Sequence, residues 1–323
     1  MEQYIEKYKV ENIFLNRYFI PNAVVNLSNQ LLELQLWRKG KFIHPKKINE
    51  HKQKLILDEI INFYEKGTIS IPQVGFAITT RCNLKCKHCN NLIPLFNNEN
   101  HKTVSFNDFV GDIDELTGGG VGIGRLIFLG GEPLLNSDLA KMVEYSAENK
   151  QIKMICITTN GTLLPSCDLV KAVSQYSDKV FFRISNYSRN KELADKLRHD
   201  AIFAVLKENN IKYILEPNEM WRKEEPLEDR NYTEAQVKDI FRYCQLNMCH
   251  SVLNGKFHIC PKSSAGYELG IIKTADSDFI NLRSRSSKNI KEELVNFYKK
   301  DCYEVCKFCV RPQEEIIPAE QIK

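Results

Sequence analysis

The sequence lacks long apolar runs and carries little net charge, and each absence excludes a class of protein. No stretch approaches the roughly 18 apolar residues of a membrane-spanning helix, so we expect no membrane association. The 45 basic and 41 acidic side chains leave a net charge of only +4, which gives no reason to expect a nucleic-acid partner. The one short basic cluster, from Arg283 to Lys288, is therefore interpreted as solvated surface.

The first residues, from Met1 to Lys9, lack the apolar core of a secretion signal, so we expect a cytoplasmic protein. Cysteine is abundant by contrast, because eleven are present and several lie in clustered spacings. The cytoplasm keeps thiols reduced, so these clusters predict metal sites instead of disulfides. At 323 residues the chain is long enough for one large domain with an appendage, or for two domains.

Three of the cysteines, Cys82, Cys86 and Cys89, are spaced C-x3-C-x2-C directly after an apolar run. Three thiolates can hold three irons of a 4Fe-4S cube and leave the fourth iron open to bind and activate a ligand. The alternative is a zinc site with His88 as the fourth ligand, but His88 lies too close to its neighbours in sequence for an unstrained tetrahedron. The spacing therefore favours an iron–sulfur cluster.

Apolar strand patterns and helical patterns alternate between residues 74 and 215. We expect strands at 74–80, 125–129, 154–158, 180–184 and 211–215, separated by helices at 107–116, 138–149, 168–176 and 191–209. This alternation predicts a parallel sheet, either a full or partial barrel or an open doubly wound sheet. In such folds, ligands bind at the carboxyl ends of the strands.

The region before this sheet is interpreted as a small cap. It carries short β-like runs at 18–27 and 31–37 and one helical stretch at 48–66. A winged-helix module that binds a leader peptide would need more helices than this stretch offers. The sequence therefore gives little support to a peptide-binding cap.

Polar stretches follow the predicted strands. Gly130 and Gly131 would let the backbone approach a ligand, and Glu132 could accept hydrogen bonds from an ammonium group. A tight strand-to-helix turn would explain the same residues. Asn160 and Ser185 suit ribose hydroxyls or a carboxylate, although each could instead cap a turn or a helix.

A second group of six cysteines lies between residues 244 and 309. The dipeptide Asn254-Gly255 between apolar runs predicts a hairpin, and counting outward from this turn pairs Cys249 with Cys260. One interpretation is a zinc ribbon, with ligands Cys249, Cys260, Cys306 and Cys309. The two remaining cysteines, Cys156 and Cys167, are interpreted as a buried inert thiol and an isolated thiol.

The motif Cys82-x3-Cys86-x2-Cys89, with His88 before its last cysteine, and the later stretch Gly-Gly-Glu-Pro resemble the signatures of the radical S-adenosylmethionine (radical SAM) enzymes. The resemblance implies an α/β fold, a partial (β/α) barrel with a small N-terminal cap and a C-terminal auxiliary-cluster domain. The boundaries that we expect are 1–71 for the cap, 72–217 for the barrel, 218–239 for a connecting loop and 240–323 for the auxiliary domain.

The same resemblance implies cofactors and roles. The first cluster would bind S-adenosylmethionine at its open iron and receive its electron from a donor such as flavodoxin or ferredoxin. The cofactor would then split to methionine and a 5′-deoxyadenosyl radical that removes a hydrogen atom from the substrate. The residues implied to contact the cofactor are Gly130, Gly131, Glu132, Asn160, Ser185 and His88.

The pattern Cys244-x10-Gly255-x4-Cys260, followed by a distant C-x2-C, resembles the shortened auxiliary-cluster domain called twitch, a relative of the SPASM domain. One auxiliary 4Fe-4S cluster needs four ligands and six cysteines are present, so the ligand set stays open. The candidates are Cys244, Cys249, Cys260, Cys306 and Cys309, with Cys302 as the last choice.

We expect a small polar, carbohydrate-like substrate, such as a sugar or nucleotide sugar. Polar and aromatic residues near the strand ends suit a hydroxylated ligand, namely Arg183, Tyr187, Asn218, Trp221 and Arg222. The substrate radical could lose an electron to the auxiliary cluster, giving a dehydrogenase. It could instead regain a hydrogen from a spare thiol among Cys244, Cys249 and Cys302, giving an epimerase. The alternatives are a peptide-modifying radical SAM enzyme and a non-catalytic zinc-binding module.

Overall fold

The computed structural model describes residues 2–10, 45–223, 227–244, 249–273, 275–284, 289–310 and 314–322. The β-like runs expected at 18–27 and 31–37, and most of the basic cluster that follows Arg283, lie outside these residues. Within the described part, no helix combines the length and the apolar character needed to cross a membrane.

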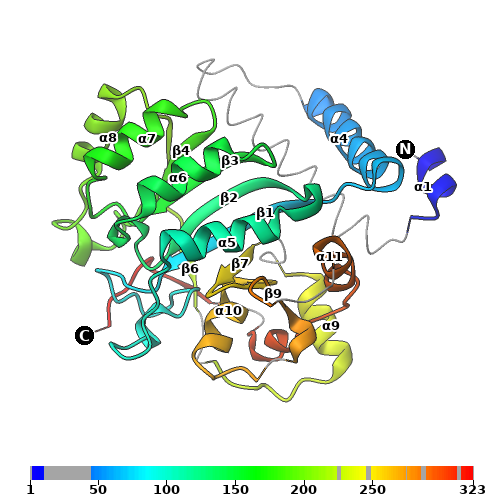
Figure 1. The fold of residues 1–323 in the computed structure, drawn as a ribbon. Helices are drawn as coiled ribbons and strands as arrows, with labels where there is room; N and C mark the ends of the chain where they lie inside the picture. The colour runs from blue at the N-terminus through cyan, green and yellow to red at the C-terminus, as the bar shows by residue number, and fades with distance from the viewer. Residues whose placement is uncertain are drawn as a thin grey trace.

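An eight-stranded sheet with the order β5-β4-β3-β2-β1-β7-β8-β9 forms the centre of the fold (Figure 1). Neighbouring strands from β1 to β5 pair in parallel, and β7 pairs in parallel with the other edge of β1. The five consecutive parallel strands are β1 (Ser70–Thr79), β2 (Gly122–Gly130), β3 (Ile152–Thr159), β4 (Val180–Ile184) and β5 (Tyr213–Leu215). The α/β fold class and the alternation expected from the sequence are therefore confirmed.

Helices connect these strands and lie against one face of the sheet (Figure 1). They are α5 (Phe106–Leu116), α6 (Leu139–Glu148), α7 (Cys167–Gln175) and α8 (His199–Glu208). The side chain of Ser105 accepts a hydrogen bond from the backbone N–H of Asp108, and Ser166 caps α7 in the same way. The stretch expected as one or two helices at 191–209 forms a short 3-10 turn, Lys191–Leu193, followed by α8.

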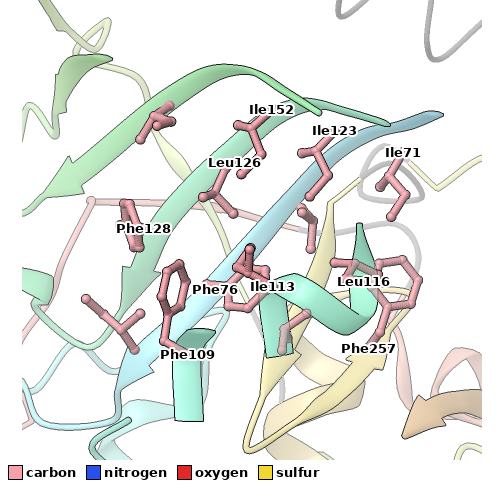
Figure 2. Close-up of a cluster of buried hydrophobic side chains, with 14 of the residues drawn as sticks. Ile71, Phe76, Phe109, Ile113, Leu116, Ile123, Leu126, Phe128, Ile152 and Phe257 are labelled. Carbon is pink, nitrogen blue, oxygen red and sulfur yellow. The ribbon is translucent and has the colours of Figure 1, made fainter. Parts of the chain in front are cut away.

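The main core lies between this helical layer and the sheet. Figure 2 shows Phe109, Ile113 and Leu116 of α5 directed at the side chains of β1 and β2. The rings of Phe76 and Phe109 pack edge to face with centroids 5.3 Å apart. These helical residues recur at intervals of three and four, so that one face of α5 is buried.

The opposite face of the sheet buries a smaller cluster, with Ile127, Met154, Cys156 and Phe181 at its centre. Because side chains alternate along a strand, Ile127 points to this inner face while its neighbours Leu126 and Phe128 point to the helices. Cys156 is 1% exposed, so the prediction of a buried thiol is confirmed.

Two helices, α1 (Glu2–Tyr8) and α4 (Pro45–Lys66), form the described part of the N-terminal region. They pack against each other through the stacked rings of Tyr8 and Tyr64, whose centroids are 4.9 Å apart. The helix α4 confirms the stretch expected at 48–66. The helix α1 was not predicted, because seven residues are too few for a clear periodic pattern.

The C-terminal region adds β7 (His250–Leu253), β8 (Lys256–His258) and β9 (Phe279–Asn281) to the sheet. The hairpin turns at Asn254 and Gly255, both with positive φ, and its register pairs Leu253 with Lys256 and Ser251 with His258. This register is the one expected from the sequence, although the strands end before Cys249 and Cys260. Helices α9 (Glu234–Arg242), α10 (Pro261–Glu268) and α11 (Ile290–Tyr298) complete the region.

The structure modifies the expected organisation in two ways. The region 240–323 shares its sheet with the barrel, because Val74 of β1 pairs with His250 of β7. The segment 218–239 was expected as a connecting loop, but it contains β6 (Trp221–Arg222) and most of α9. Strand β6 pairs antiparallel with β10 (Glu315–Ile316). The domain boundaries themselves stay predictions.

Candidate active site

A cavity of about 470 Å³ opens where the parallel strands end. Gly130 at the end of β2, Thr158 and Thr159 at the end of β3, and Ser185 after β4 all contribute to its wall. Thiols from both cysteine groups line it as well, namely Cys82, Cys86, Cys89, Cys244, Cys260 and Cys309. The fold therefore joins two cysteine groups that lie far apart in the sequence.

The first three cysteines come from the loop that follows β1. The ladder between β1 and β2 shifts register between Ala77 and Thr79, immediately before this loop begins. The backbone N–H of Leu84 donates to Cys82 Sγ over 3.4 Å, and backbone N–H groups of residues 91–93 bond to Cys89. Donors directed at sulfur favour the thiolate form, which is the form that binds metal.

Burial has the opposite effect on the same thiols. It raises the pKa of Cys82 to about 11 and the pKa of Cys86 to about 12, and it also raises the pKa of Cys89. The mutual repulsion of neighbouring thiolates adds to the shift of Cys82 and Cys86. A bound iron–sulfur cluster offsets this cost, because the metal stabilises the thiolate. Three adjacent thiols with N–H donors aimed at their sulfurs therefore fit a 4Fe-4S cluster.

The zinc alternative would require at least three ligand atoms around one ion position. Among the described residues, no three His, Cys, Asp or Glu side chains are grouped closely enough to hold a single metal ion. A cluster places its cysteine ligands on different irons, so it does not need that convergence.

The two glycines after β2 allow the cysteine loop to pass close to the strand. Gly130 has a φ of 134°, and a Cβ atom at this position would lie 2.2 Å from the carbonyl oxygen of Thr79. A Cβ on Gly131 would lie 2.0 Å from the carbonyl oxygen of Arg81. Two backbone bonds, from Gly131 N to Thr79 O and from Glu132 N to Arg81 O, close this contact. Both glycines also line the cavity.

Glu132 is completely buried beneath these glycines. Its carboxylate accepts hydrogen bonds from the backbone N–H groups of Asn160, at 2.8 Å, and Leu134, at 3.2 Å. Burial raises the pKa of this carboxyl to about 7. The contacts fit the turn interpretation, because Glu132 links the loops after β2 and β3. Its predicted contact with the amino group of S-adenosylmethionine stays a prediction.

A polar network behind Cys82 fixes the start of the cysteine loop. Asn160 Nδ2 donates to Asn83 Oδ1 over 2.9 Å and lies 3.8 Å from Cys82 Sγ. Asn83 Nδ2 donates in turn to Thr162 Oγ1 over 2.7 Å. Asn83 and Thr162 were not predicted as site residues, although Asn83 lies inside the cysteine motif and Thr162 is two positions after Asn160. Asn160, Ser185 and His88 line the cavity, so their predicted roles remain open to test.

Most of the residues proposed to meet the substrate line the same cavity. Arg183, Tyr187, Trp221 and Arg222 do so, whereas Asn218 is not among the described lining residues. Arg183 Nε lies 3.4 Å from a carboxylate oxygen of Glu216, and the rings of Tyr187 and Trp221 meet edge to face. Two further lining residues, Glu216 and Lys262, were missed because neither has a motif around it.

Four cysteines of the second group lie close together. Cys244, Cys260 and Cys309 line the cavity, and the buried Cys306 is near enough to all three that their charges would raise its pKa. Burial raises the pKa of Cys260 to about 12, and Cys309 and Cys244 add to that shift. The structure therefore brings together one set of four thiols.

The other two cysteines of this group have partly different neighbours. Cys249 accepts a hydrogen bond from Gln73 Nε2 over 3.4 Å and lies next to Arg183. Burial raises the pKa of Cys249, and the charge of Cys244 would raise it as well. Cys302 lies beside Lys238 and Asp301. Neither is among the described residues that line the cavity. Both cysteines were expected as possible hydrogen donors, and Cys249 also as a metal ligand. These roles stay predictions.

Curated proteins with similar sequences are named GTP 3′,8-cyclases. The chain is 32% identical to the GTP 3′,8-cyclase of Clostridium acetobutylicum over 141 residues, which are 41% of this chain and 43% of that protein. It is 41% identical to the probable GTP 3′,8-cyclase of Methanococcus vannielii over 98 residues, 30% of this chain and 31% of that protein. The chain thus matches less than half the length of these curated relatives.

Comparison with solved structures gives matches of low sequence identity and low TM-score. BtrN in complex with AdoMet and 2-DOIA is 14% identical with a TM-score of 0.47, over 77% of this chain and 96% of that one. SuiB of Streptococcus suis bound to S-adenosylmethionine is 19% identical with a TM-score of 0.35, over 55% of this chain and 39% of that one.

The sequence model of the Radical SAM superfamily matches residues 76–245, which is more than half of the chain. This match includes the cysteine loop after β1, the two glycines after β2 and the polar network after β3. The family expected from the cysteine motif is therefore confirmed. The chain belongs to the radical SAM superfamily, and S-adenosylmethionine and a 4Fe-4S cluster are the cofactors that go with this family.

Proposed function

We propose that this enzyme removes a hydrogen atom from a small polar substrate and that the substrate radical then passes an electron to an auxiliary iron–sulfur cluster. The observation that carries the proposal is the shared cavity. Thiols of the first group and thiols of the second group line the same space of about 470 Å³. A substrate bound there would lie between two proposed clusters. The cluster held by the first cysteine group would start the reaction, and the cluster held by the second group would accept an electron from the substrate radical.

Cys82, Cys86 and Cys89 are the proposed ligands of the first cluster. When bound, this cluster supplies the electron that cleaves S-adenosylmethionine to methionine and the 5′-deoxyadenosyl radical. The chain itself shapes the cofactor site. Gly130 and Gly131 keep the wall of the cavity free of side chains, and Asn160 holds the loop around Cys82.

Cys244, Cys260, Cys306 and Cys309 are the proposed ligands of the auxiliary cluster, in a twitch-like region within 240–323. Four thiolates are the usual ligand set of a 4Fe-4S cluster. The support is their proximity, since the charges of the other three thiols all act on Cys306. This set leaves out Cys249 and Cys302, which the sequence alone could not separate from the others.

The proposed reaction is a two-electron oxidation. A substrate C–H bond breaks homolytically, and its hydrogen atom forms a C–H bond in 5′-deoxyadenosine. An auxiliary cluster held by Cys244, Cys260, Cys306 and Cys309 would accept one electron from the substrate radical, and one proton would pass to the surroundings, so the product would be two hydrogens lighter. Flavodoxin or ferredoxin is the proposed class of external redox partner. Epimerisation would need a thiol hydrogen donor at the cavity. Of the three candidates, Cys249 and Cys302 are not among its described lining residues, and Cys244, which lines it, is proposed here as a ligand of the auxiliary cluster.

The proposed substrate is small and polar, because charged and aromatic side chains line the cavity beside the cysteines. These include Arg183, Glu216, Trp221 and Lys262. Such groups provide both hydrogen bonds and an apolar surface for a compact ligand. The curated relatives are named for GTP and give no support to a carbohydrate. GTP is therefore the first compound to test, and nucleotide sugars are the second.

The test uses anaerobically reconstituted protein and a reductant. The triple variant Cys82→Ala, Cys86→Ala, Cys89→Ala should form no 5′-deoxyadenosine and should keep about half of the iron, because the auxiliary ligands are intact. Cys302→Ala is the matched control, and it should keep both the iron and the cleavage activity. Cleavage by the triple variant, or a folded triple variant without iron, would refute the two-cluster proposal.

The fate of the substrate radical is measured by mass spectrometry of products formed in heavy water. Loss of two hydrogens supports the oxidation. A product of unchanged composition that carries solvent deuterium on carbon would show epimerisation instead, and a product with a new carbon–carbon or carbon–sulfur bond would contradict both.

A further inference from the structure

A segment from the C-terminal region lies across the cysteine loop, and we call residues 314–322 the strap. Strand β10 of the strap pairs with β6, and the chain then reaches the loop that contains Cys86. In Figure 1 this red segment passes beside the cyan loop that follows β1. The strap thus contacts a part of the molecule that is more than 200 positions earlier in the sequence.

Backbone hydrogen bonds hold the strap in register with the loop. Lys87 N donates to Glu320 O over 2.7 Å, and Ile322 N donates to Lys85 O over 2.8 Å. Between these two bonds, Cys86 and Gln321 form an antiparallel bridge. This register places the side chain of Gln321 beside the Cys86 thiol.

A second contact fixes the strap two residues before Gln321, at Ala319. Ala319 is completely buried, in a cluster with Leu84, Cys86 and Leu193. Asn190 Nδ2 donates to the carbonyl oxygen of Ala319 over 2.8 Å. The strap is therefore fixed on both sides of Glu320, and its contact with the loop is part of the folded core.

The amide of Gln321 directs an N–H group at the sulfur of Cys86. Its Oε1 accepts a hydrogen bond from Lys85 N over 2.9 Å, and its Nε2 donates to Ala319 O over 2.6 Å and to Cys86 Sγ over 3.4 Å. A flipped amide would set an oxygen against the Ala319 carbonyl and an N–H against the Lys85 N–H. The surrounding network therefore determines which end of the amide faces the sulfur.

The donor to Cys86 comes from the other end of the sequence. Cys82 and Cys89 accept hydrogen bonds from backbone N–H groups of their own loop, and Cys82 also has the side-chain amide of Asn160 at 3.8 Å, from 78 positions away. The Gln321 donor comes from a side chain 235 positions away. A hydrogen bond to a cluster-ligating thiolate stabilises the more negative, reduced state and so raises the reduction potential.

We infer that Gln321 is a positioning residue that raises the reduction potential of the cluster held by Cys82, Cys86 and Cys89. The inference rests on the proposed ligation of the first cluster and goes beyond it. Cleavage of S-adenosylmethionine requires that this cluster be reduced by an external donor. The reduction potential of this cluster thereby depends on the folding of the C-terminal region, because the strap carries Gln321.

The test is a potentiometric titration of the holoenzyme followed by electron paramagnetic resonance. The signal that changes on addition of S-adenosylmethionine identifies the first cluster. Gln321→Met removes the N–H donor and should lower the midpoint potential. Gln321→Glu keeps an acceptor for Lys85 N–H and adds a negative charge, so it should lower the potential further. Iron content should remain at the wild-type level in both variants.

Glu320→Gln is the matched control on the same strap. It removes the exposed ion pair between Lys87 and Glu320, whose charged atoms lie 3.5 Å apart, without touching the sulfur. The midpoint potential of this variant should equal that of the wild type. If Gln321→Met loses iron, the inference is tested by the midpoint potential of Gln321→Glu, which should be lower than that of the wild type.

Unchanged midpoint potentials in iron-replete Gln321 variants would overturn the inference. Failure of the underlying ligation would look different. In that case the Cys82, Cys86 and Cys89 triple variant would still show a signal that responds to S-adenosylmethionine. The two outcomes are therefore separate.

Discussion

At the scale of single residues, the site depends on how closely two backbone segments approach. The carbonyl oxygen of Arg81 occupies the space that a side chain on Gly131 would need. The glycine is therefore required by the path of the cysteine loop, whatever ligand binds in the cavity. The short distance between the two segments also explains two backbone hydrogen bonds, which Gly131 N–H and Glu132 N–H donate to the carbonyl oxygens of Thr79 and Arg81.

Gly131→Ala should therefore displace the cysteine loop. A Cβ atom 2.0 Å from Arg81 O forces a backbone shift, and overpacking of this kind costs about 1 to 3 kcal/mol or more. We expect a lower melting temperature and less iron per chain after reconstitution. Gly111→Ala is the control, because its Cβ would meet no atom within 4 Å and lies in α5, where alanine should add about 1 kcal/mol. Equal iron contents in the two variants would refute the explanation.

At the scale of elements, one ion pair joins α5 to the segment after β9. Asp112 is 2% exposed, and its carboxylate accepts two hydrogen bonds from the guanidinium of Arg283, at 2.8 and 2.9 Å. Burial raises the pKa of Asp112, while Arg283 acts in the opposite direction. The basic residue that begins the cluster at 283–288 is thus an internal partner as well as part of the surface.

Arg283→Met should be destabilising, because it leaves the buried Asp112 carboxylate without its partner. The Arg283 side chain is 37% exposed, so the expected loss is that of a buried acceptor without its donor, about 1 to 3 kcal/mol, and smaller than for a fully buried pair. Urea unfolding should show this loss, and the double variant Arg283→Met, Asp112→Asn should recover part of it. Asp108→Asn weakens the longer, exposed contact of Arg283, at 3.8 Å, and keeps an oxygen that can accept the hydrogen bond from Ser105 Oγ, so it should change stability by less than about 1 kcal/mol. Similar losses for Arg283→Met and Asp108→Asn would contradict this assignment.

At the scale of the whole molecule, the junction between the barrel and the C-terminal region contains a buried histidine. The ring of His250 contacts Gln73 O through Nδ1, at 2.8 Å, and the hydroxyl of Tyr298 through Nε2, at 3.1 Å. A neutral ring satisfies both contacts if Nδ1–H donates to the carbonyl and Nε2 accepts from the phenol. Burial lowers the pKa of His250 to about 4.

This junction should weaken in acid. The unfolded chain binds a proton on His250 near its ordinary pKa of about 6.5, whereas the folded chain binds it only near pH 4. The neutral His250 ring therefore makes its full contribution to the free energy of unfolding above pH 6.5. This contribution decreases as the pH falls toward 4, by about 3 kcal/mol in total. Thermal unfolding at pH 7 and pH 5 should show a smaller decrease for His250→Gln than for the wild type. Equal decreases would exclude His250 as the cause.

The sequence was sufficient to predict the elements whose signals are local. The helix α5 begins at a Ser105 cap, and the hairpin turns at Asn254-Gly255, because caps and turns depend on neighbouring residues. The cysteine loop was predicted for the same reason. The contact between Gln321 and Cys86 could not be predicted, because no local pattern links positions so far apart.

The pairing of β1 with β7 was also beyond sequence reasoning, since either strand could pair with several others. The same limit applied to the second cysteine group. Spacing offered six cysteines and ranked Cys302 last, and the fold shows that Cys244, Cys260 and Cys309 line the cavity with Cys306 near them. Apart from the short helix α1, these missed features depend on tertiary packing.

The position of β7 also has a consequence for synthesis of the chain. Strands β1 to β5 can pair in the order in which they leave the ribosome, but the outer edge of β1 stays open until residues 250–253 have emerged. An unpaired edge on a largely apolar strand can pair with another chain, and contacts between distant residues form slowly. The nascent protein therefore has a period of exposure to aggregation that ends when β7 covers β1, before Cys260, Cys302, Cys306 and Cys309 of the second cysteine group have been synthesised.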